Sequence, residues 1–377
     1  MIKKIGVAGA GAMGTGIAQV AAISGHHVVV FDSNKSATDK ARKLVDSNLM
    51  KLESRGKIDN ADQIAGRIQF ADSVVQFSEA DFIIEAIVED LNAKKSLFQS
   101  LENVISKRCI LATNTSSLSV TSIAASCSVA ERVIGVHFFN PATIMDLVEI
   151  VPALQTDPDI VRITRDLVVG WNKTVVLCKD TPGFIVNRIA RPFYGEALRI
   201  LDEGIASCET IDEAMRKAGF RMGPFELMDF IGHDVNFRVT ESVFQSFYFD
   251  PRYRPSFTQR RLFEAGWFGR KSGRGFYDYS ETALKIQPDV SESLQNAIFI
   301  RIFAMLVNEA ADALHFKVAT EQDIELAMKK GVNYPKGLFE WAAEIGVEKI
   351  VDELDSLYIT YGEDRYRCSP LLRMRAR

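Results

Sequence analysis

His137 and Glu149 are ionisable residues in two short runs that otherwise consist of residues typical of a protein interior, within HFFNPATIMDLVEI (137–150). An ionised carboxylate on an apolar strand face needs a donor or charged partner, and a histidine one or two strands away can supply it. Histidine titrates near neutrality, and a carboxylate behind it stabilises the imidazolium form. The pair therefore predicts general acid and base chemistry on a hydroxyl group. The alternative is a core histidine satisfied by a structural carboxylate.

The other four histidines are weaker candidates. His26 and His27 lie in a predicted turn at the start of a strand, and His315 lies near the end of a late helix. His233 falls in a predicted loop of the second half of the chain, where it is a minor candidate for a substrate contact. His137 is the preferred base.

The N-terminal segment predicts a cofactor-binding unit, and its cofactor could act as the oxidant beside this base. Residues 3–8 have the pattern of a short buried strand, residues 15–24 that of a helix, and residues 28–31 that of a second strand, which ends at Asp32. This is a complete βαβ opening with an acidic residue at the end of its second strand. Asp32 would accept hydrogen bonds from ribose hydroxyls and repel a 2′-phosphate, so the predicted cofactor is NAD rather than NADP.

A G-x-G-x-x-G motif joins the first strand to the helix, and each glycine has a mechanical reason. Gly9 makes the tight turn, Gly11 lets the backbone approach a pyrophosphate, and Gly14 lets the helix pack close to the strand. The helix N-terminus then offers free N–H groups to the anion. The predicted cofactor loop consists of Gly9, Gly11, Ala12, Met13 and Gly14.

Further strand-like runs alternate with helical patterns such as residues 93–105. This alternation predicts a mostly parallel, doubly wound sheet, with ligands bound beyond the carboxyl ends of its strands. The predicted strands are residues 81–87, 109–113, 132–138 and 147–151. The polar residues at the carboxyl ends are Asp32, Glu89 and Lys94, Asn114 to Ser117, and His137 to Pro141.

Composition excludes several other classes of protein. The chain has 377 residues, enough for two or three domains, and its 47% hydrophobic and 25% charged residues are typical of globular cores. The net charge is −4, and the sequence has no basic patch suited to binding nucleic acid. The five cysteines are scattered, which argues against disulfides or a metal site and favours a reducing cytoplasm. No signal-peptide pattern or apolar run long enough to span a membrane is present.

The second half of the chain predicts helices only. Residues 180–183 (DTPG) indicate a helix start, with an N-cap candidate followed by proline, which places Asn187 in the first turns. Loops are expected at Gly204, Gly219 to Pro224, Gly232 and Gly266 to Gly275. The predicted domains are residues 1–183, 184–281 and 293–377.

Residues 187–232 and 307–346 align as an internal repeat, so the helical domain is duplicated. The second copy lacks the PGFIVNR start, and Asn187 has no obvious counterpart in it. The matched pairs are Glu196-Ala197 with Glu309-Ala310, Ala214-Met215 with Ala327-Met328, Pro224 with Pro335, and Ile231-Gly232 with Ile345-Gly346.

The chain resembles the 3-hydroxyacyl-CoA dehydrogenase family, which oxidises (3S)-3-hydroxyacyl-CoA to 3-ketoacyl-CoA with NAD. The resemblance implies a Rossmann-like domain followed by helical domains of the 6-phosphogluconate dehydrogenase C-terminal type. The matching stretches are GAGAMGTGIAQVAA, DFIIEAIVEDLNAKKSLF, NTSSLSV, HFFNPATIMDLVEI, DTPGFIVNRI and GRKSGRGFYDY, in family order over residues 1–281.

The resemblance also assigns roles to individual residues. It implies that His137 is the acid/base and Glu149 its partner, and that Ser116 and Asn187 hydrogen-bond the substrate oxygens. Asn140 lies in the family's sequence motif around the histidine and is implied to contact the substrate. The family's cofactor positions fall on Asp32, Glu89, Lys94 and Asn114.

The acyl chain of the substrate stays open at this level. The tail and the two-copy arrangement resemble bacterial enzymes of phenylacetate breakdown that act on 3-hydroxyadipyl-CoA, and a distal carboxylate would want a cation, for which Arg191, Arg221 and Arg238 are candidates. A hydroxybutyryl or other short acyl chain is equally credible. Lys51 and Arg55 are candidate CoA contacts.

Three other functions are weighed against this one. A dehydrogenase of a free hydroxy acid such as gulonate would share the fold and the pair. A non-enzymatic NAD-binding regulator would be expected to lack the catalytic base, but His137 and Glu149 are both present. A structural or interaction protein would have no need of an intact active site. The helical domain mediates dimerisation in the family, and two copies in one chain could make that contact internally. The expected state is therefore either a monomer or a homodimer with a different interface.

Overall fold

The apolar runs of the first half of the chain pair into one eight-stranded sheet. The computed structural model describes residues 2–284 and 286–377. The chain divides into two compact units, which meet in sequence at Phe184 and Ile185. The first unit contains β1 (Lys4–Ala8), α1 (Ala12–Ile23), β2 (His27–Phe31), α2 (Lys35–Ser54), α3 (Ala61–Ala65), β3 (Ile68–Ala71), η1 (Val74–Phe77), β4 (Phe82–Glu85), α4 (Leu91–Glu102), β5 (Ile110–Thr113), α5 (Val120–Ala124), η2 (Ala130–Arg132), β6 (Val133–Phe138), β7 (Leu147–Pro152), α6 (Pro158–Gly170) and β8 (Thr174–Leu177).

The strand order is β3-β2-β1-β4-β5-β6-β7-β8, and every neighbouring pair is parallel except β6 and β7. The predicted doubly wound, mostly parallel sheet is therefore confirmed. The sequence patterns missed β3 and β8, which are four-residue strands at the two edges of the sheet. Each has only one or two fully buried positions, so neither produces a strong apolar run.

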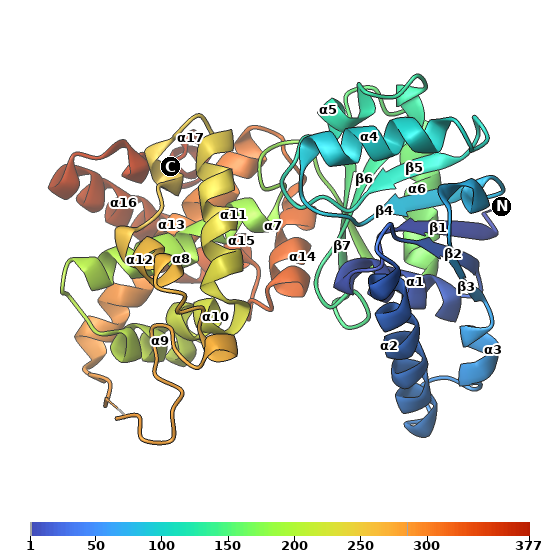
Figure 1. The fold of residues 1–377 in the computed structure, drawn as a ribbon. Coiled ribbons are helices and arrows are strands. Elements are labelled where there is room, and N and C mark those ends of the chain that lie inside the picture. Colours follow the sequence, from blue (N-terminus) through green and yellow to red (C-terminus); the bar gives the residue numbers. More distant parts are fainter. Residues whose placement is uncertain (1, 285) are drawn as a thin grey trace. The chain divides into compact units, whose positions relative to one another are not determined.

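Helices cover both faces of this sheet (Figure 1). On one face α1, α2 and α6 share a hydrophobic cluster that includes Ile17, Val45 and Val168. On the other face α4 and α5 pack next to each other. Both faces are thus sealed, which leaves the carboxyl ends of the strands as the place where polar groups collect.

The second unit is built from helices. It contains α7 (Val186–Ile189), α8 (Arg191–Asp202), α9 (Cys208–Lys217), α10 (Pro224–Ile231), α11 (His233–Ser246), η3 (Pro251–Tyr253), α12 (Phe257–Glu264), η4 (Arg270–Ser272), α13 (Glu292–His315), α14 (Glu321–Gly331), α15 (Leu338–Ile345), α16 (Val347–Tyr361), η5 (Asp364–Tyr366) and α17 (Pro370–Arg375). No helix among the described residues has the length and apolar character needed to cross a bilayer.

The element order of this unit repeats. The series α8, α9, α10, α11, η3 and α12 has the same order as α13, α14, α15, α16, η5 and α17. Gly232 and Gly346 make the same break between two helices, with φ values of 97° and 105°. The predicted duplication is confirmed, and both copies belong to the same compact unit.

One pair in the predicted repeat is wrong, namely Pro224 with Pro335. Pro224 is the first residue of α10, whereas α15 begins at Leu338, so the two prolines are not equivalent. The equivalent residues are the N-cap glycines Gly223 and Gly337, which both lie against a carboxylate of the preceding helix. That close approach leaves no room for a side chain.

The helix start predicted at residues 180–183 is a few residues too early. Residues 182–185 form a turn, and α7 begins at Val186, so the carboxylate of Asp180 caps no helix of its own segment. Its carboxylate instead accepts hydrogen bonds from the N–H groups of Val120 and Thr121 and the hydroxyl of Ser119, at the start of α5. The carboxylate thus satisfies N–H groups that have no partner within the first turn of that helix.

The two helical copies exchange charged side chains. Glu309 of the second copy is fully buried and accepts hydrogen bonds from the first copy. Arg188 Nε and Tyr253 Oη each lie 2.5 Å from Glu309 Oε1, and Arg252 Nη1 lies 3.1 Å from Oε2.

The reverse contact has the same residue types. Glu196 of the first copy is fully buried, with Arg301 Nε at 2.8 Å, Tyr366 Oη at 2.8 Å and Arg365 Nη2 at 3.1 Å. Each copy therefore supplies one glutamate, two arginines and one tyrosine to the other. This reciprocity is what a twofold interface between two subunits would show, here within one chain.

Candidate active site

The glycine loop has the geometry that dinucleotide binding needs. Gly9 has φ +114°, and a Cβ there would lie 2.4 Å from the carbonyl oxygen of Ala86. A Cβ on Gly14 would lie 1.9 Å from the carbonyl oxygen of Gly9, so the helix and the loop touch through backbone alone. A Cβ on Gly11 would meet nothing within 4 Å, which leaves open space beside the N-terminus of α1. These residues fit a bound pyrophosphate.

Asp32 lies at the end of β2, beside this loop. Its Oδ2 accepts a hydrogen bond of 2.8 Å from Ala10 N, and its Oδ1 one of 2.8 Å from Asn34 N. The carboxylate thus orders the loop, and a carboxylate has further lone pairs that can accept from a ribose. Ala12 and Met13 form the first turn of α1, as the motif predicts.

A buried ion pair lies at the ends of β4 and α4. Lys94 is 1% exposed, with its Nζ 2.6 Å from Glu85 Oε1 and 3.2 Å from Glu89 Oε2. Thr113 donates to Glu85 Oε2 at 2.7 Å. Burial raises the pKa of Glu89, but the charge of Lys94 and hydrogen bonds from residues 115 and 116 outweigh it and hold that pKa below its ordinary value. Glu89 is therefore ionised at neutral pH.

Polar residues after β5 hold the adjoining loop. Thr115 Oγ1 and Ser116 N donate to Glu89 Oε1 at 2.6 and 2.9 Å. Asn114 Oδ1 accepts from Phe138 N at 2.8 Å, which ties the end of β5 to the end of β6. The carboxyl ends of β4, β5 and β6 are thus one hydrogen-bonded edge.

His137 and Glu149 lie directly opposite each other in the β6–β7 pair. Glu149 Oε2 is 2.7 Å from His137 Nδ1, Glu149 is fully buried, and His137 is 6% exposed. The rings of Phe139 and Phe184 lie 4.5 and 5.9 Å from the imidazole. With Nδ1 bound to the carboxylate and apolar rings beside it, the imidazole has Nε2 left for a reacting group.

The remaining predicted residues are more exposed. Asn140 is exposed after β6, and Lys51 and Arg55 are exposed at the end of α2. Asn187 is half-buried in α7 and belongs to the second unit. The structure therefore brings together the predicted residues of the first unit, except Lys51 and Arg55, along the carboxyl edge of one sheet.

His233 is not accessible to a substrate. It is the first residue of α11, not a loop residue, and is 0% exposed. Its Nε2 lies 2.9 Å from Asp229 Oδ1, and its ring packs against Phe276. Asp229 also accepts from the backbone N–H groups of Phe276 and Tyr277, so this histidine stabilises the loop after η4.

Sequence reasoning missed Glu85 and Thr113. Glu85 is the fourth residue of an otherwise apolar strand, and nine positions later comes the lysine that neutralises it. The same argument that singled out Glu149, an acid on an apolar strand, would have found Glu85.

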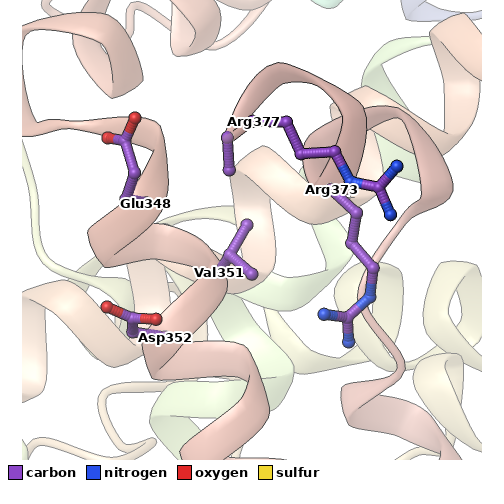
Figure 2. A pocket seen from close by; sticks show the side chains of 6 residues that line it. Glu348, Val351, Asp352, Arg373 and Arg377 are labelled. Carbon is purple, nitrogen blue, oxygen red and sulfur yellow. The ribbon is translucent and has the colours of Figure 1, made fainter.

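A separate hollow of about 320 Å³ lies between α16 and α17 (Figure 2). It is lined by acidic Glu348 and Asp352 and basic Arg373 and Arg377, with Val351 between them. Arg373 also forms an ion pair with Asp355. None of the predicted site residues lines this hollow, so it is distinct from the edge described above.

Two family models match the chain. Residues 4–181 match the NAD-binding domain of 3-hydroxyacyl-CoA dehydrogenase. The C-terminal domain of the same family matches twice, over residues 183–279 and 298–377. The second match covers the second helical copy.

Similar proteins cover the chain in two ways. A 3-hydroxyadipyl-CoA dehydrogenase of Escherichia coli K12 is 37% identical, over all of this chain and 98% of that protein. A probable 3-hydroxybutyryl-CoA dehydrogenase of Deinococcus radiodurans is 42% identical, over 73% of this chain and 100% of that protein. The shorter relative thus aligns without a second helical copy.

A solved structure agrees over the whole length. The crystal structure of a 3-hydroxybutyryl-CoA dehydrogenase from Escherichia coli K12 has a TM-score of 0.93 and 36% identity, over all of this chain and 98% of that one. The eight-stranded sheet and both helical copies therefore belong to a known architecture. The chain is a member of the 3-hydroxyacyl-CoA dehydrogenase family of NAD-dependent oxidoreductases.

Proposed function

We propose that the chain oxidises (3S)-3-hydroxyacyl-CoA to 3-ketoacyl-CoA, with His137 as the base that takes the hydroxyl proton. The observation that carries the proposal is the 2.7 Å contact between His137 and the fully buried Glu149. It lies at the same sheet edge as the glycine loop, because β6 runs in the same direction as β1. A free hydroxy acid as substrate is less well supported, because the relatives named above act on CoA thioesters.

Different residues transfer the proton and stabilise the charge that forms in this reaction. NAD supplies the acceptor for the hydride that leaves C3. His137 Nε2 removes the hydroxyl proton as the carbonyl forms, and Glu149 stabilises the positive ring that results. Ser116 and Asn187 hydrogen-bond the substrate oxygens. In the reverse direction, the imidazolium returns its proton to the oxygen of C3.

Other residues bind and orient the two reactants. Asp32, Glu89, Lys94 and Asn114 line the cofactor side; the buried ion pair of Lys94 and the hydrogen bond from Asn114 to Phe138 keep that side rigid. Asn140 belongs to the substrate side. Lys51 and Arg55 are exposed cations suited to the phosphates of CoA.

Substitution of His137 tests the proposal. His137→Gln keeps the size and polarity of the side chain but removes the titrating ring. Turnover of acetoacetyl-CoA with NADH should fall roughly 10²- to 10⁴-fold, the usual contribution of a positioned acid or base. NADH binding, followed by fluorescence, should not change. A variant that keeps the full rate would show that another group carries the proton.

We also propose that the protein is a monomer. Among the described residues, the two helical copies already satisfy each other through Glu196 and Glu309. The surface that a one-copy relative would need for a second subunit is therefore used within the chain. We further propose a cytoplasmic location, because the five scattered cysteines suit a reducing compartment.

A further inference from the structure

Glu85, the last residue of β4, lies beside the cofactor loop but is fully buried. It pairs with Ala8 of β1, the residue before Gly9. A Cβ on Gly9 would lie 2.4 Å from the carbonyl oxygen of Ala86, so the chain directly after Glu85 touches the glycine turn. Because its side chain has no exposed surface, Glu85 can act on a bound cofactor only through its charge or through the residues that it holds.

Hydrogen-bond donors surround the carboxylate of Glu85. Lys94 Nζ and Ile87 N lie 2.6 and 2.8 Å from Oε1, and Thr113 Oγ1 lies 2.7 Å from Oε2. Thr115 N donates to the hydroxyl oxygen of Thr113 at 3.2 Å, which leaves the hydroxyl hydrogen for Glu85. An ionised carboxylate, which only accepts hydrogen bonds, suits all three donors. Glu85 therefore contributes a fixed negative charge at the carboxyl end of β4.

The charges of this cluster do not cancel. Lys94 is 1% exposed, and its Nζ also lies 3.2 Å from Glu89 Oε2. No second lysine or arginine within residues 2–284 and 286–377 forms an ion pair with either glutamate, so two carboxylates share one ammonium group. A buried ammonium group needs a buried counter-charge, and Glu85 is the closer and deeper partner. Glu85 thus neutralises Lys94, and the excess negative charge falls on Glu89, whose side chain is 38% exposed.

We propose that Glu85 is a positioning residue that tunes the preference between the two redox forms of the cofactor: it neutralises Lys94, so that the charge of Glu89 acts on the nicotinamide ring. The inference rests on the proposed function, in which Glu89 and Lys94 lie on the cofactor side. The ring is positively charged in NAD⁺ and uncharged in NADH. A cluster with one net negative charge therefore favours NAD⁺ over NADH, and a neutral cluster would not.

The test compares the dissociation constants of NAD⁺ and NADH in wild type and in Glu85→Gln. NADH binding is followed by fluorescence, and NAD⁺ binding by displacement of NADH. Glutamine has nearly the same size as glutamate but makes the cluster neutral. The ratio of the NAD⁺ constant to the NADH constant should rise about fourfold, the effect of one unit charge over about 10 Å at an effective dielectric constant of about 40. An unchanged ratio, with or without an equal loss of both affinities, would overturn the proposal.

Two matched variants separate charge from packing. Glu79→Gln removes a glutamate charge before the opposite end of the same strand, where Glu79 pairs with Lys4 at 2.9 Å and is 80% exposed. Solvent screens that charge, so the ratio should stay within about 1.5-fold of wild type. Glu85→Asp keeps the charge on a shorter side chain, so the ratio should stay within about 1.5-fold even if both affinities fall. A ratio that shifts in Glu85→Asp as much as in Glu85→Gln would contradict the charge argument.

Two further variants keep the test decisive if Glu85→Gln does not fold. Glu89→Gln also makes the cluster neutral, at a side chain that is 38% exposed, and should raise the ratio in the same way. The double variant Glu85→Gln/Lys94→Met removes one carboxylate and the ammonium group together. It keeps the charge of Glu89 and should leave the ratio unchanged. A shifted ratio in the double variant, or none in Glu89→Gln, would overturn the role assigned to the cluster.

Failure of the inference and failure of the proposed function give different results. A wild-type protein that reduces acetoacetyl-CoA with NADH, but whose ratio does not respond to Glu85→Gln, would overturn only the role of Glu85. A wild-type protein that binds both forms of the cofactor but reduces no acyl-CoA thioester would overturn the proposed function. In that case a fourfold shift of the ratio in Glu85→Gln would still support the role of Glu85, because the binding measurement needs no substrate.

Discussion

Glu309→Gln should destabilise the helical unit by an amount that depends on pH. Burial raises the pKa of Glu309, but Arg188, Arg252 and the hydroxyl of Tyr253 outweigh it and bring that pKa from its ordinary value of 4.5 to about 2. The difference corresponds to roughly 3 kcal/mol of stability that the ionised carboxylate contributes. The glutamine leaves Arg188 without a negative partner, so a loss of about 3 to 5 kcal/mol is expected at pH 7.

The sign of the pH dependence follows from the lowered pKa. A carboxylate whose pKa is lower in the folded state contributes its full stability above pH 4.5, and the contribution is lost as the pH falls toward 2. At pH 3 the folded protein therefore keeps only part of it, with roughly 2 kcal/mol already lost. The glutamine variant has no such group, so its disadvantage relative to wild type should shrink by that amount between pH 7 and pH 3.

Urea titrations of the full chain at both pH values, followed by far-ultraviolet circular dichroism, measure this change. Glu348→Gln is the control, because it removes the same charge at an exposed position. Other carboxylates titrate over the same range, but they cancel in the difference between variant and wild type. A disadvantage of Glu309→Gln that stays constant within about 1 kcal/mol from pH 7 to pH 3 would refute the argument that the two arginines hold this group ionised.

Three other predictions concern the cofactor edge and the assembly. Glu149→Gln should lower turnover roughly 10²-fold or more because the ring of His137 loses its counter-charge, while NADH affinity measured by fluorescence stays the same; a loss of NADH binding instead would indicate a structural role. Gly14→Ala should weaken NADH binding at least about tenfold, because its Cβ would lie 1.9 Å from the carbonyl oxygen of Gly9; unchanged affinity in the same titration would contradict the close packing of loop and helix. Light scattering at micromolar concentration should give the monomer mass of 42.0 kDa, and a mass twice as large would contradict the proposal that the internal contact replaces a dimer.

Sequence patterns predicted the cofactor loop and most of the sheet because those features depend on local chemistry. Glycine spacing, apolar runs and strand ends are all readable in one segment at a time. The edge strands β3 and β8 were missed, since each has four residues and is only partly buried. The contacts of Asp180 at the start of α5 were missed for another reason, because the two segments are distant in the chain.

The pairing of His137 with Glu149 was predicted from burial, but their direct opposition was not. A mostly parallel sheet was expected, so the histidine could be placed only to within one or two strands of the carboxylate. The connection between β6 and β7 runs only from residue 139 to 146, which is shorter than the crossover that two parallel neighbours need. Loop length therefore contained the evidence for an antiparallel pair, and an antiparallel register brings the two side chains face to face.

The duplicated domain provides a comparison inside a single chain, which a one-copy protein cannot. Positions with the same residue in both copies, such as Arg188 and Arg301, make the contact that holds the copies together. Asn187 and Arg191 correspond to Ile300 and Ala304, which lie within the long apolar stretch of α13. The fold can therefore fill these two places with aliphatic side chains, so their polarity in the first copy needs an explanation other than packing. The hydrogen bond that we propose between Asn187 and a substrate oxygen would explain the first of these two positions.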